Sequence, residues 1–289
     1  MANEANEPNR VTTFLSITGM NNLELQFLAN LSPEISEPDS NWSVIADMAH
    51  RPAINWAKVY EAKSWLTSMD RSLGGFLFAV SMDGKLHSDE IGTWRVTDLR
   101  CPGLNAVWAA SDNEVFAVGE SATRVNVLGT VVNVVRGLPD QRLNAVHGTS
   151  PQNVLAVGDN GLILRYDGVN WNELEVATNY NLLAVFCRSE TEAYVAGAQG
   201  VLMRFDGTDF KHLVAPEELI ITDLAWYRDA LYVASGQNGI HVLGQDRLER
   251  IKELIVYGLR TVDGLLFAWG NNLVVQFDGS GWWGGRINL

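Results

Sequence analysis

One stretch of the chain, residues 143–176, decides the fold: LNAVHGTSPQNVLAVGDNGLILRYDGVNWNELEV. Short apolar runs begin at Leu143, Val154 and Leu162, and a fourth run begins at Trp171. The breaks between these runs are Ser150-Pro151-Gln152-Asn153, Asp159-Asn160-Gly161 and Asp167-Gly168. Asn-Gly and Asp-Gly pairs suit tight turns, because both residues of such a pair accept positive φ. The stretch therefore predicts four short antiparallel strands joined by hairpins.

This unit recurs along the chain every 38–39 residues, except that the last interval is 34 residues. Its second strand carries a small-residue motif, which reads Phe116-Ala117-Val118-Gly119, Leu155-Ala156-Val157-Gly158 and Tyr194-Val195-Ala196-Gly197, with looser copies at 78–81, 232–235 and 267–270. A bulky residue follows each of the six copies, and Trp56 lies one period before the first of these bulky residues. The seven positions are Trp56, Trp94, Val132, Trp171, Phe210, Leu248 and Trp282. Four-stranded units repeated at this spacing are typical of propeller blades. We predict an all-β protein with a single closed β-propeller of seven four-stranded blades; six blades plus an N-terminal extension is the alternative.

The bulky residues are expected to fill the space between neighbouring blades at the rim, where the sheets splay apart. The expected blade-core anchors are Trp56, Trp94, Trp171, Phe210 and Trp282. The pattern is less regular near the start of the chain. Residues 1–10 are interpreted as a disordered N-terminus, 11–64 as an irregular first blade or N-terminal segment, and 65–289 as six regular blades of the same domain.

The composition narrows the classes of partner. The chain has 289 residues and a formal net charge of −13, so phosphate backbones and anionic membranes are expected to repel it. We therefore expect neither nucleic-acid nor membrane binding, while a basic protein partner is compatible with this charge. Cys101 and Cys187 form no disulfide framework and no metal-ligand pattern. The first residues contain no apolar signal segment, which predicts synthesis and folding in the cytoplasm.

Three turns share one pattern: Tyr166-Asp167-Gly168 before Trp171, Phe205-Asp206-Gly207 before Phe210, and Phe277-Asp278-Gly279 before Trp282. This pattern resembles bacterial propeller repeats that are grouped with WD40-, YVTN- and BNR-like repeats. The resemblance covers residues 65–289 and implies a propeller fold. It implies little about function, because such propellers bind proteins, glycans or small ligands and some are enzymes. The chain lacks the Trp-Asp dipeptide of WD40 repeats, and 88–94 is one residue short of a sialidase Asp-box, which disfavours a glycosidase.

A second resemblance lies near the N-terminus. Gly19-Met20-Asn21-Asn22, followed by Leu28-Ala29-Asn30, looks like the opening of some tailed-phage tail or neck proteins. It implies a virion component that folds in the cytoplasm and is then incorporated into a particle. The alternative interpretation is an Asn-rich turn between two strands.

The residues that could carry chemistry form no catalytic, cofactor-binding or metal-binding arrangement. The five histidines are scattered, and the chain has no P-loop, G-x-S-x-G or H-E-x-x-H motif. His147 stands where neighbouring units carry Trp108 and Phe186, so it is expected near the central channel as a hydrogen-bonded core residue. Asp167 and Asp206 occupy equivalent turns, which favours a structural role. We predict a protein that is not an enzyme and needs no cofactor.

The loops suggest where a partner docks. The turns that include Ser111-Asp112-Asn113-Glu114 and the Asp-Gly turns are expected to make one face acidic. The opposite face carries Arg100, Arg142 and Tyr180, and is the expected partner-binding face. We predict a protein-interaction or structural assembly module, with a phage virion component as one form of it. The alternatives are a glycan-binding propeller and an acidic immunity protein against a basic toxin. Residues 1–55 break the repeat and are therefore the first place to look for function.

Overall fold

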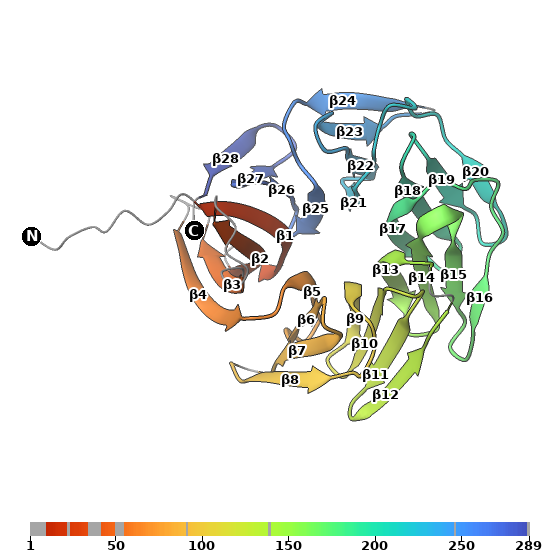
Figure 1. Ribbon diagram of the computed structural model, residues 1–289. Helices are drawn as coiled ribbons and strands as arrows, with labels where there is room; N and C mark the ends of the chain where they lie inside the picture. The colour runs from red at the N-terminus through yellow and green to blue at the C-terminus, as the bar shows by residue number, and fades with distance from the viewer. Residues whose placement is uncertain are drawn as a thin grey trace, which may run out of the picture.

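The computed structural model describes residues 10–21, 24–33, 42–49, 55–90, 92–137, 140–245 and 247–287. It shows seven four-stranded antiparallel sheets arranged as blades around a central axis (Figure 1). This confirms the all-β, single closed β-propeller of seven blades, and six blades plus an extension is wrong. Residues 1–9, most of the expected disordered N-terminus, lie outside the described residues.

The strands of each blade follow one another in chain order from the axis to the rim. Blades 1 and 2 consist of β1 (Arg10–Asn21), β2 (Glu24–Pro33), β3 (Trp42–Ala49) and β4 (Asn55–Ala62), then β5 (Leu66–Arg71), β6 (Leu77–Ser81), β7 (Lys85–Asp89) and β8 (Trp94–Asp98). Blades 3 and 4 consist of β9 (Leu104–Ser111), β10 (Glu114–Gly119), β11 (Arg124–Leu128) and β12 (Val131–Val135), then β13 (Leu143–Ser150), β14 (Asn153–Gly158), β15 (Ile163–Tyr166) and β16 (Trp171–Glu173).

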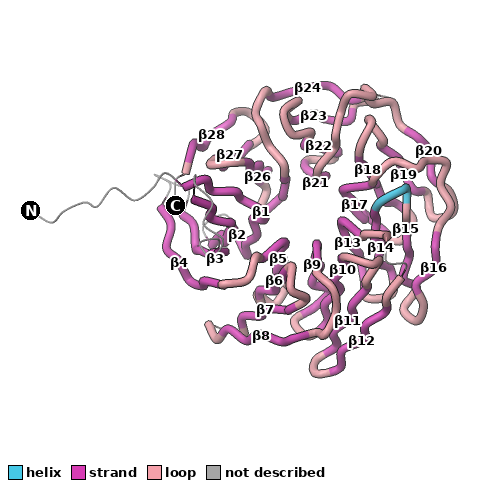
Figure 2. Tube along the Cα trace, in the orientation of Figure 1, coloured by secondary structure: helices cyan, strands magenta, loops and turns pink. Residues whose placement is uncertain are grey.

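The remaining three blades repeat the same order. Blades 5 and 6 consist of β17 (Leu182–Ser189), β18 (Glu192–Gly197), β19 (Leu202–Phe205) and β20 (Phe210–His212), then β21 (Asp223–Tyr227), β22 (Ala230–Ala234), β23 (Ile240–Leu243) and β24 (Leu248–Lys252). Blade 7 consists of β25 (Gly258–Val262), β26 (Leu265–Gly270), β27 (Leu273–Phe277) and β28 (Trp282–Arg286). The one helix in the described ranges is the 3-10 turn η1 (Asp159–Gly161), shown in cyan in Figure 2, so no described helix could cross a membrane.

The second strand of a blade lies between two neighbouring sheets and is buried along its length, as β14 shows. Its last residue, Gly158, packs against the loop that enters the same blade, where the Asp159 N–H donates to the Arg142 carbonyl at 2.9 Å. A Cβ at Gly158 would collide with that carbonyl oxygen. The same close approach occurs at Gly119 and Gly197, which explains the glycine that ends the repeated motif.

The inner strands are joined by side chains that bond to the backbone of the next blade. Asn105 Nδ2 donates to the Leu143 carbonyl at 2.9 Å, and Asn144 Nδ2 donates to the Leu182 carbonyl at 2.9 Å. These bonds satisfy carbonyls at the inner edges of the blades, where no further strand can pair with them. They account for the recurrence of Leu-Asn-Ala-Val at 104–107 and 143–146.

Residues 10–62, where the repeat is least regular in sequence, form blade 1 with strands of 12, 10, 8 and 8 residues. Phe14 and Phe27 pack edge to face in its core, with ring centroids 5.1 Å apart, in one cluster with blade-7 residues such as Trp269. The ring closes because β1 lies against blade 7: the Asn272 N–H donates to the Thr12 carbonyl at 2.8 Å. Closure therefore uses packing and hydrogen bonds between two complete blades, without exchange of a strand.

Candidate functional site

The three residues predicted to bind a partner lie in successive loops between blades. Arg100 lies between β8 and β9, Arg142 between β12 and β13, and Tyr180 between β16 and β17. The Arg142 guanidinium is engaged by Glu120, with Nε 2.9 Å from Oε1. Tyr180 is 49% exposed. The structure thus spreads these side chains along one face and does not gather them into a pocket.

The rim aromatics divide into two groups. Trp94, Trp171, Phe210 and Trp282 are partly buried and contact neighbouring rings. The Trp282 ring, for example, stacks on Phe277 with the ring centroids 4.8 Å apart. Trp56 differs from this expectation, because it is 41% exposed. Its strand, β4, turns nearly all of its side chains to solvent, so Trp56 lies at the surface of blade 1 and not between two blades.

The repeated Asp-Gly turns have a structural role, as expected. The carboxylate of Asp206 accepts the backbone N–H groups of Thr208 and Asp209 at 3.0 and 2.9 Å. These backbone hydrogen bonds lower the pKa of Asp206 to about 2. Asp167 and Asp278 accept the equivalent bonds in their own turns. Each aspartate holds its turn in shape, so none of the three is a candidate acid or base.

The central channel contains an ion pair that spans three blades. Arg260 of blade 7 reaches across blade 1 to Asp70 of blade 2, with Nη2 2.6 Å from Oδ1. The other carboxylate oxygen of Asp70 accepts the Ala109 N–H of blade 3 at 2.9 Å. Asp70 is 3% exposed, so both of its oxygens are occupied within the ring. This arrangement fixes the relative position of the inner strands.

His147 is hydrogen-bonded within the ring, as the sequence predicted. Its Nδ1 accepts the Cys187 N–H at 3.0 Å, and its ring stacks on Phe186 with centroids 5.0 Å apart. Burial lowers the pKa of His147 to about 4, so the ring is neutral near pH 7. Cys187 is 4% exposed and burial raises its pKa to about 12, which leaves the thiol unreactive.

Asp223 occupies the matching edge of blade 6. Its two oxygens accept the N–H groups of Leu224 and Leu259, each at 2.8 Å. Burial raises the pKa of Asp223 to about 6, although both hydrogen bonds act in the opposite direction. Asp223 and His147 thus perform the same task, which is to accept a backbone N–H from the next blade.

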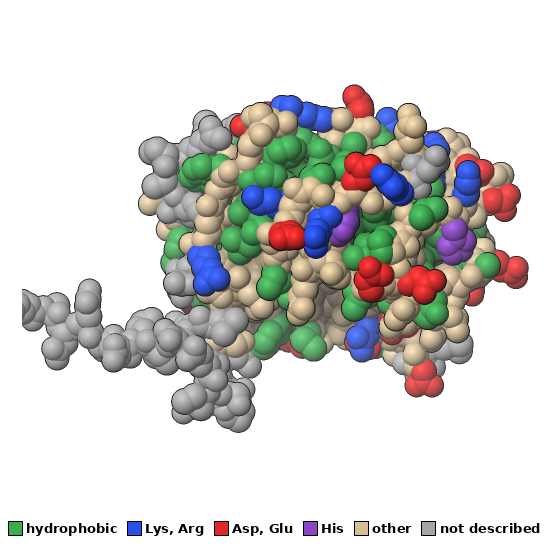
Figure 3. Space-filling view, turned by 90° about the horizontal axis from the view of Figure 1, so that it is seen from above, with side chains coloured by type: hydrophobic (Ala, Val, Ile, Leu, Met, Phe, Trp, Pro, Cys, Tyr) green, Lys and Arg blue, Asp and Glu red, His purple; other side chains and the backbone are tan. Residues whose placement is uncertain are grey.

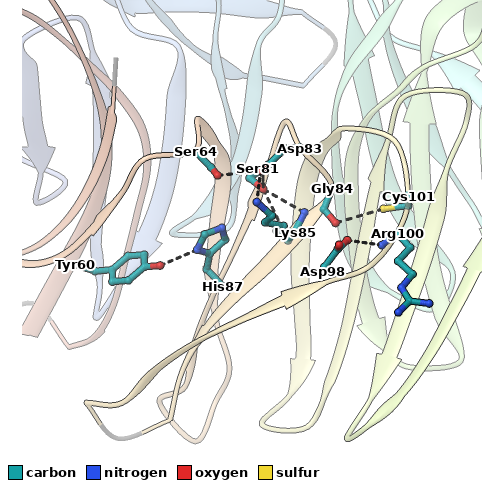
Figure 4. Close-up of polar contacts among 10 residues, drawn as sticks. All are labelled: Tyr60, Ser64, Ser81, Asp83, Gly84, Lys85, His87, Asp98, Arg100 and Cys101. Carbon is teal, nitrogen blue, oxygen red and sulfur yellow. Dashed lines mark hydrogen bonds and ion pairs between the residues drawn. The ribbon is translucent and has the colours of Figure 1, made fainter. Parts of the chain in front are cut away.

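Blade 2 carries a polar cluster around Asp83, in the turn between β6 and β7 (Figure 4). Asp83 accepts hydrogen bonds from Ser64, Ser81 and Lys85. Burial would raise the pKa of Asp83, but these bonds lower it to about 2. In the same view, Tyr60 of β4 contacts the buried His87, with Oη 2.9 Å from Nδ1. The cluster joins blade 1 to blade 2 and presents its polar groups to one another, not to an open cavity.

An open cavity lies at one end of blade 1 and has a volume of about 520 Å³. The β1–β2 hairpin and the facing ends of β3 and β4 build it, because the strands of blade 1 are longer than those of the other blades. Its lining combines an exposed tryptophan, two methionines, two carboxylates and one guanidinium: Trp56, Met20, Met48, Glu24, Asp47 and Arg71.

Hydrogen bonds to neutral groups orient the one guanidinium in the wall of this cavity. Arg71 Nη2 donates to Gln26 Oε1, and Gln26 Nε2 donates to Asp47 Oδ1 at 2.7 Å. Arg71 also donates to the Gly75 carbonyl. Burial lowers the pKa of Arg71, while the charges of Asp89, and then of Asp47 and Glu24, act to raise it. The guanidinium therefore positions Asp47 through Gln26, and the cavity lining combines carboxylate, thioether and indole groups with this one guanidinium.

The sequence predicted this region only in part. It directed attention to residues 1–55 because they break the repeat, and it singled out Trp56, although for a different role. Gln26, Asp47 and Arg71 gave no signal, because they come from three strands whose register is visible only in the folded blade. The Gly19-Met20-Asn21 segment forms the end of β1, where Asn21 Oδ1 accepts the Glu24 N–H at 3.0 Å and closes the hairpin.

The architecture defines the chain as a seven-bladed β-propeller. No protein-family profile and no curated protein sequence matches it. Its fold is similar to the WD40 propeller domain of Doa1, with a TM-score of 0.75 and 8% identity over 92% of each chain. It is also similar to the WD40 repeats of RRP9, with a TM-score of 0.70 and 10% identity over 98% of this chain and 94% of that one.

Virginiamycin B lyase from Staphylococcus aureus has a similar fold, with a TM-score of 0.69 and 15% identity over 78% of this chain and 85% of that one. At these identities the likeness shows the fold alone, and it includes one protein named as an enzyme beside two WD40 domains. Neither the resemblance to phage tail proteins nor the grouping by Tyr-Asp-Gly-x-x-Trp repeats gains support from these structures.

Proposed function

We propose that the protein is a non-enzymatic interaction module, and that the blade-1 cavity receives a basic side chain of a protein partner. The observation that carries this proposal is the juxtaposition of Trp56, Asp47 and Glu24 around an open volume of about 520 Å³. A carboxylate pair beside an exposed indole suits a lysine or arginine, since the cation gains both charge pairing and contact with the aromatic face.

The rest of the molecule supports a role without catalysis. The acidic and imidazole groups of the channel, Asp70, His147 and Asp223, accept backbone N–H groups at 2.8–3.0 Å, and Asp70 also pairs with Arg260. They are therefore committed to holding the inner strands together. A formal charge of −13 attracts a basic partner from a distance, which raises the rate of encounter.

Among the alternatives drawn from sequence, an acidic immunity protein that neutralises a basic toxin fits this cavity best, because both require capture of cationic side chains. A virion component and a glycan-binding propeller remain proposals without a specific observation in their favour. The Gly-Met-Asn-Asn segment, on which the virion interpretation depends, contributes Met20 to the cavity and Asn21 to a hairpin.

The proposal is tested with a fluorescent peptide of about ten residues rich in Arg and Lys, whose anisotropy is followed during titration. We expect Asp47→Lys and Trp56→Ala to weaken binding at least about tenfold, and rising salt to weaken binding to the wild type. Asp209→Lys, which makes the same charge change at an exposed turn of blade 5, is the matched control and should retain most of the affinity. Equal loss in Asp47→Lys and Asp209→Lys would reveal general charge attraction and overturn the cavity as the site.

A further inference from the structure

The outermost strand of blade 3, β12, differs from the outer strands of the other six blades. It reads Val131-Val132-Asn133-Val134-Val135 and contains no charged residue. Each of the other outer strands contains at least one: Lys58 in β4, Arg95 in β8, Glu173 in β16, Lys211 in β20, Arg250 in β24 and Arg286 in β28. Charges on an edge strand oppose pairing with another chain, so β12 alone lacks this protection.

The outer surface around β24 is charged, with Lys and Arg side chains lying among Asp and Glu (Figure 3). On β12, by contrast, Val131 is 62% exposed, Val135 is 45% exposed and Asn133 is exposed between them. β12 is the last strand of its sheet, at the outside of the ring (Figure 1). Among the described residues, β11 is the one strand with which it pairs.

The register shows which backbone groups of β12 point outward. Leu128 pairs with Val131 across the two-residue turn Gly129-Thr130, so this pair closes a hairpin of the type in which the closing residues exchange hydrogen bonds. Because such bonds alternate along an antiparallel pair, the outward N–H and C=O groups of β12 belong to Val132 and Val134.

The sequence of β12 is the same in both directions about Asn133. An antiparallel pair of two β12 strands related by a two-fold axis at Asn133 places Val132 opposite the Val134 of the second copy. These are the residues with outward backbone groups, so the two strands exchange a full set of hydrogen bonds. Asn133 then faces itself in the non-hydrogen-bonded position, where side chains come closest and the two amides can bond to each other.

The surface beside β12 is also suited to a second copy. A groove of about 380 Å³ between blades 2 and 3 has apolar side chains in its wall, namely Phe78, Leu86, Val115, Val127 and Val132, together with the charged Glu90, Arg95 and Asp112. In the two-fold arrangement, Val134 of the second copy lies opposite Val132 and extends this apolar lining. Thr130 falls opposite Arg136, so no like charges face each other across the axis.

We infer that β12 is a self-association edge, through which two copies of this chain pair antiparallel about Asn133. The contact of five residues is smaller than a standard protein interface, so the association is a concentration-dependent equilibrium. A net charge of −13 on each copy opposes it at low salt, and dimer formation therefore increases as salt rises. This dependence is opposite to that expected for the basic partner, so the two proposals fail independently.

The test is sedimentation velocity from about 1 to about 300 µM, the range in which small interfaces associate. We expect the mass to rise from 31.9 kDa toward twice that value. Asn133→Asp and Asn133→Lys should each weaken association at least about tenfold, because like charges then meet at the axis, and an equimolar mixture of the two should restore it. Val134→Pro should also abolish pairing, since it removes an outward N–H and leaves the bond to β11 intact.

Ile251→Asp, at a 38% exposed position of β24, is the matched control and should associate like the wild type. Circular dichroism melting checks that each variant is folded. A wild type that stays monomeric over the whole range, a dimer that persists in Val134→Pro, or a mixture of Asn133→Asp and Asn133→Lys that does not associate would overturn the inference. Binding of an extended segment of another protein to β12 of a monomeric wild type would do the same.

Discussion

Blade 1 and blade 4 have the same four-stranded order but are built from different sequences. Blade 4 has strands of 8, 6, 4 and 3 residues, and it carries the repeated small-residue motif and the Asp-Gly turn. Blade 1 has strands of 12, 10, 8 and 8 residues. Where β13 pairs Ala145 with Val157, β1 pairs the much larger Phe14 with Ala29. A blade therefore needs alternating strands and a neighbour to bury them, and the repeated motif is only one way to satisfy this requirement.

The difference also separates scaffold from candidate function. In blade 4 the polar side chains, such as Asn144 and Asp167, are occupied by backbone groups. In blade 1 the extra strand length builds the cavity around Trp56 and Asp47. The comparison predicts that blade 1 carries both the most costly core positions and the binding site.

The largest expected loss of stability comes from a substitution in the core of blade 1. Phe27 is fully buried, so Phe27→Ala should lower the free energy of unfolding by about 3–5 kcal/mol. The matched change in blade 4, Trp171→Ala, should cost about 2 kcal/mol, because Trp171 is partly exposed. Denaturant unfolding followed by circular dichroism compares the two variants. A cost for Trp171→Ala that equals or exceeds that of Phe27→Ala would show that the regular blades, not blade 1, hold the ring together.

The next largest effect is the pH dependence of stability, to which the channel residues His147 and Asp223 contribute with opposite signs. The unfolded state binds a proton at histidine below about pH 6.5, whereas burial keeps His147 neutral down to about pH 4, so stability from this residue is lost as the pH falls through that window. Asp223 acts in the opposite sense: its folded pKa of about 6 lies above the unfolded value, so its contribution is lost as the pH rises from about 4 to 6.

We therefore expect Asp223→Asn to make acid destabilisation steeper than in the wild type, and His147→Phe to make it shallower. Each change should amount to about 2–3 kcal/mol between pH 6.5 and 4. The lowered pKa values of His87 and His241, both caused by burial, contribute equally to all three proteins and cancel in the comparison. Denaturant midpoints measured at several pH values test this, and parallel curves for the three proteins would contradict it.

Much of the fold could be predicted from sequence, because two linked patterns recur with a fixed period. The glycine of the motif and the aspartate of the turn are required by local backbone geometry, so they recur at the same positions of the repeat and can be recognised in the sequence. The role of Trp56 was mispredicted because a period carries no information about strand length. β4 has eight residues, whereas the outer strands of the other blades have three to five, and Trp56 near its start is exposed. The Arg260–Asp70 pair joins residues 190 positions apart, and no pattern in the chain indicates it.

The central claim, that blade 1 and not the regular blades binds a cationic side chain, is tested most directly by following the tryptophan indole N–H signals in ¹H–¹⁵N spectra. The Trp56 signal is assigned with Trp56→Phe, and the protein is titrated with N-acetyl-arginine amide and, as a control, with N-acetyl-glutamine amide. The account predicts that the Trp56 signal shifts in a saturable way with the arginine derivative alone, while the Trp171 signal stays in place. No shift at Trp56, or equal shifts at Trp56 and Trp171, would contradict it.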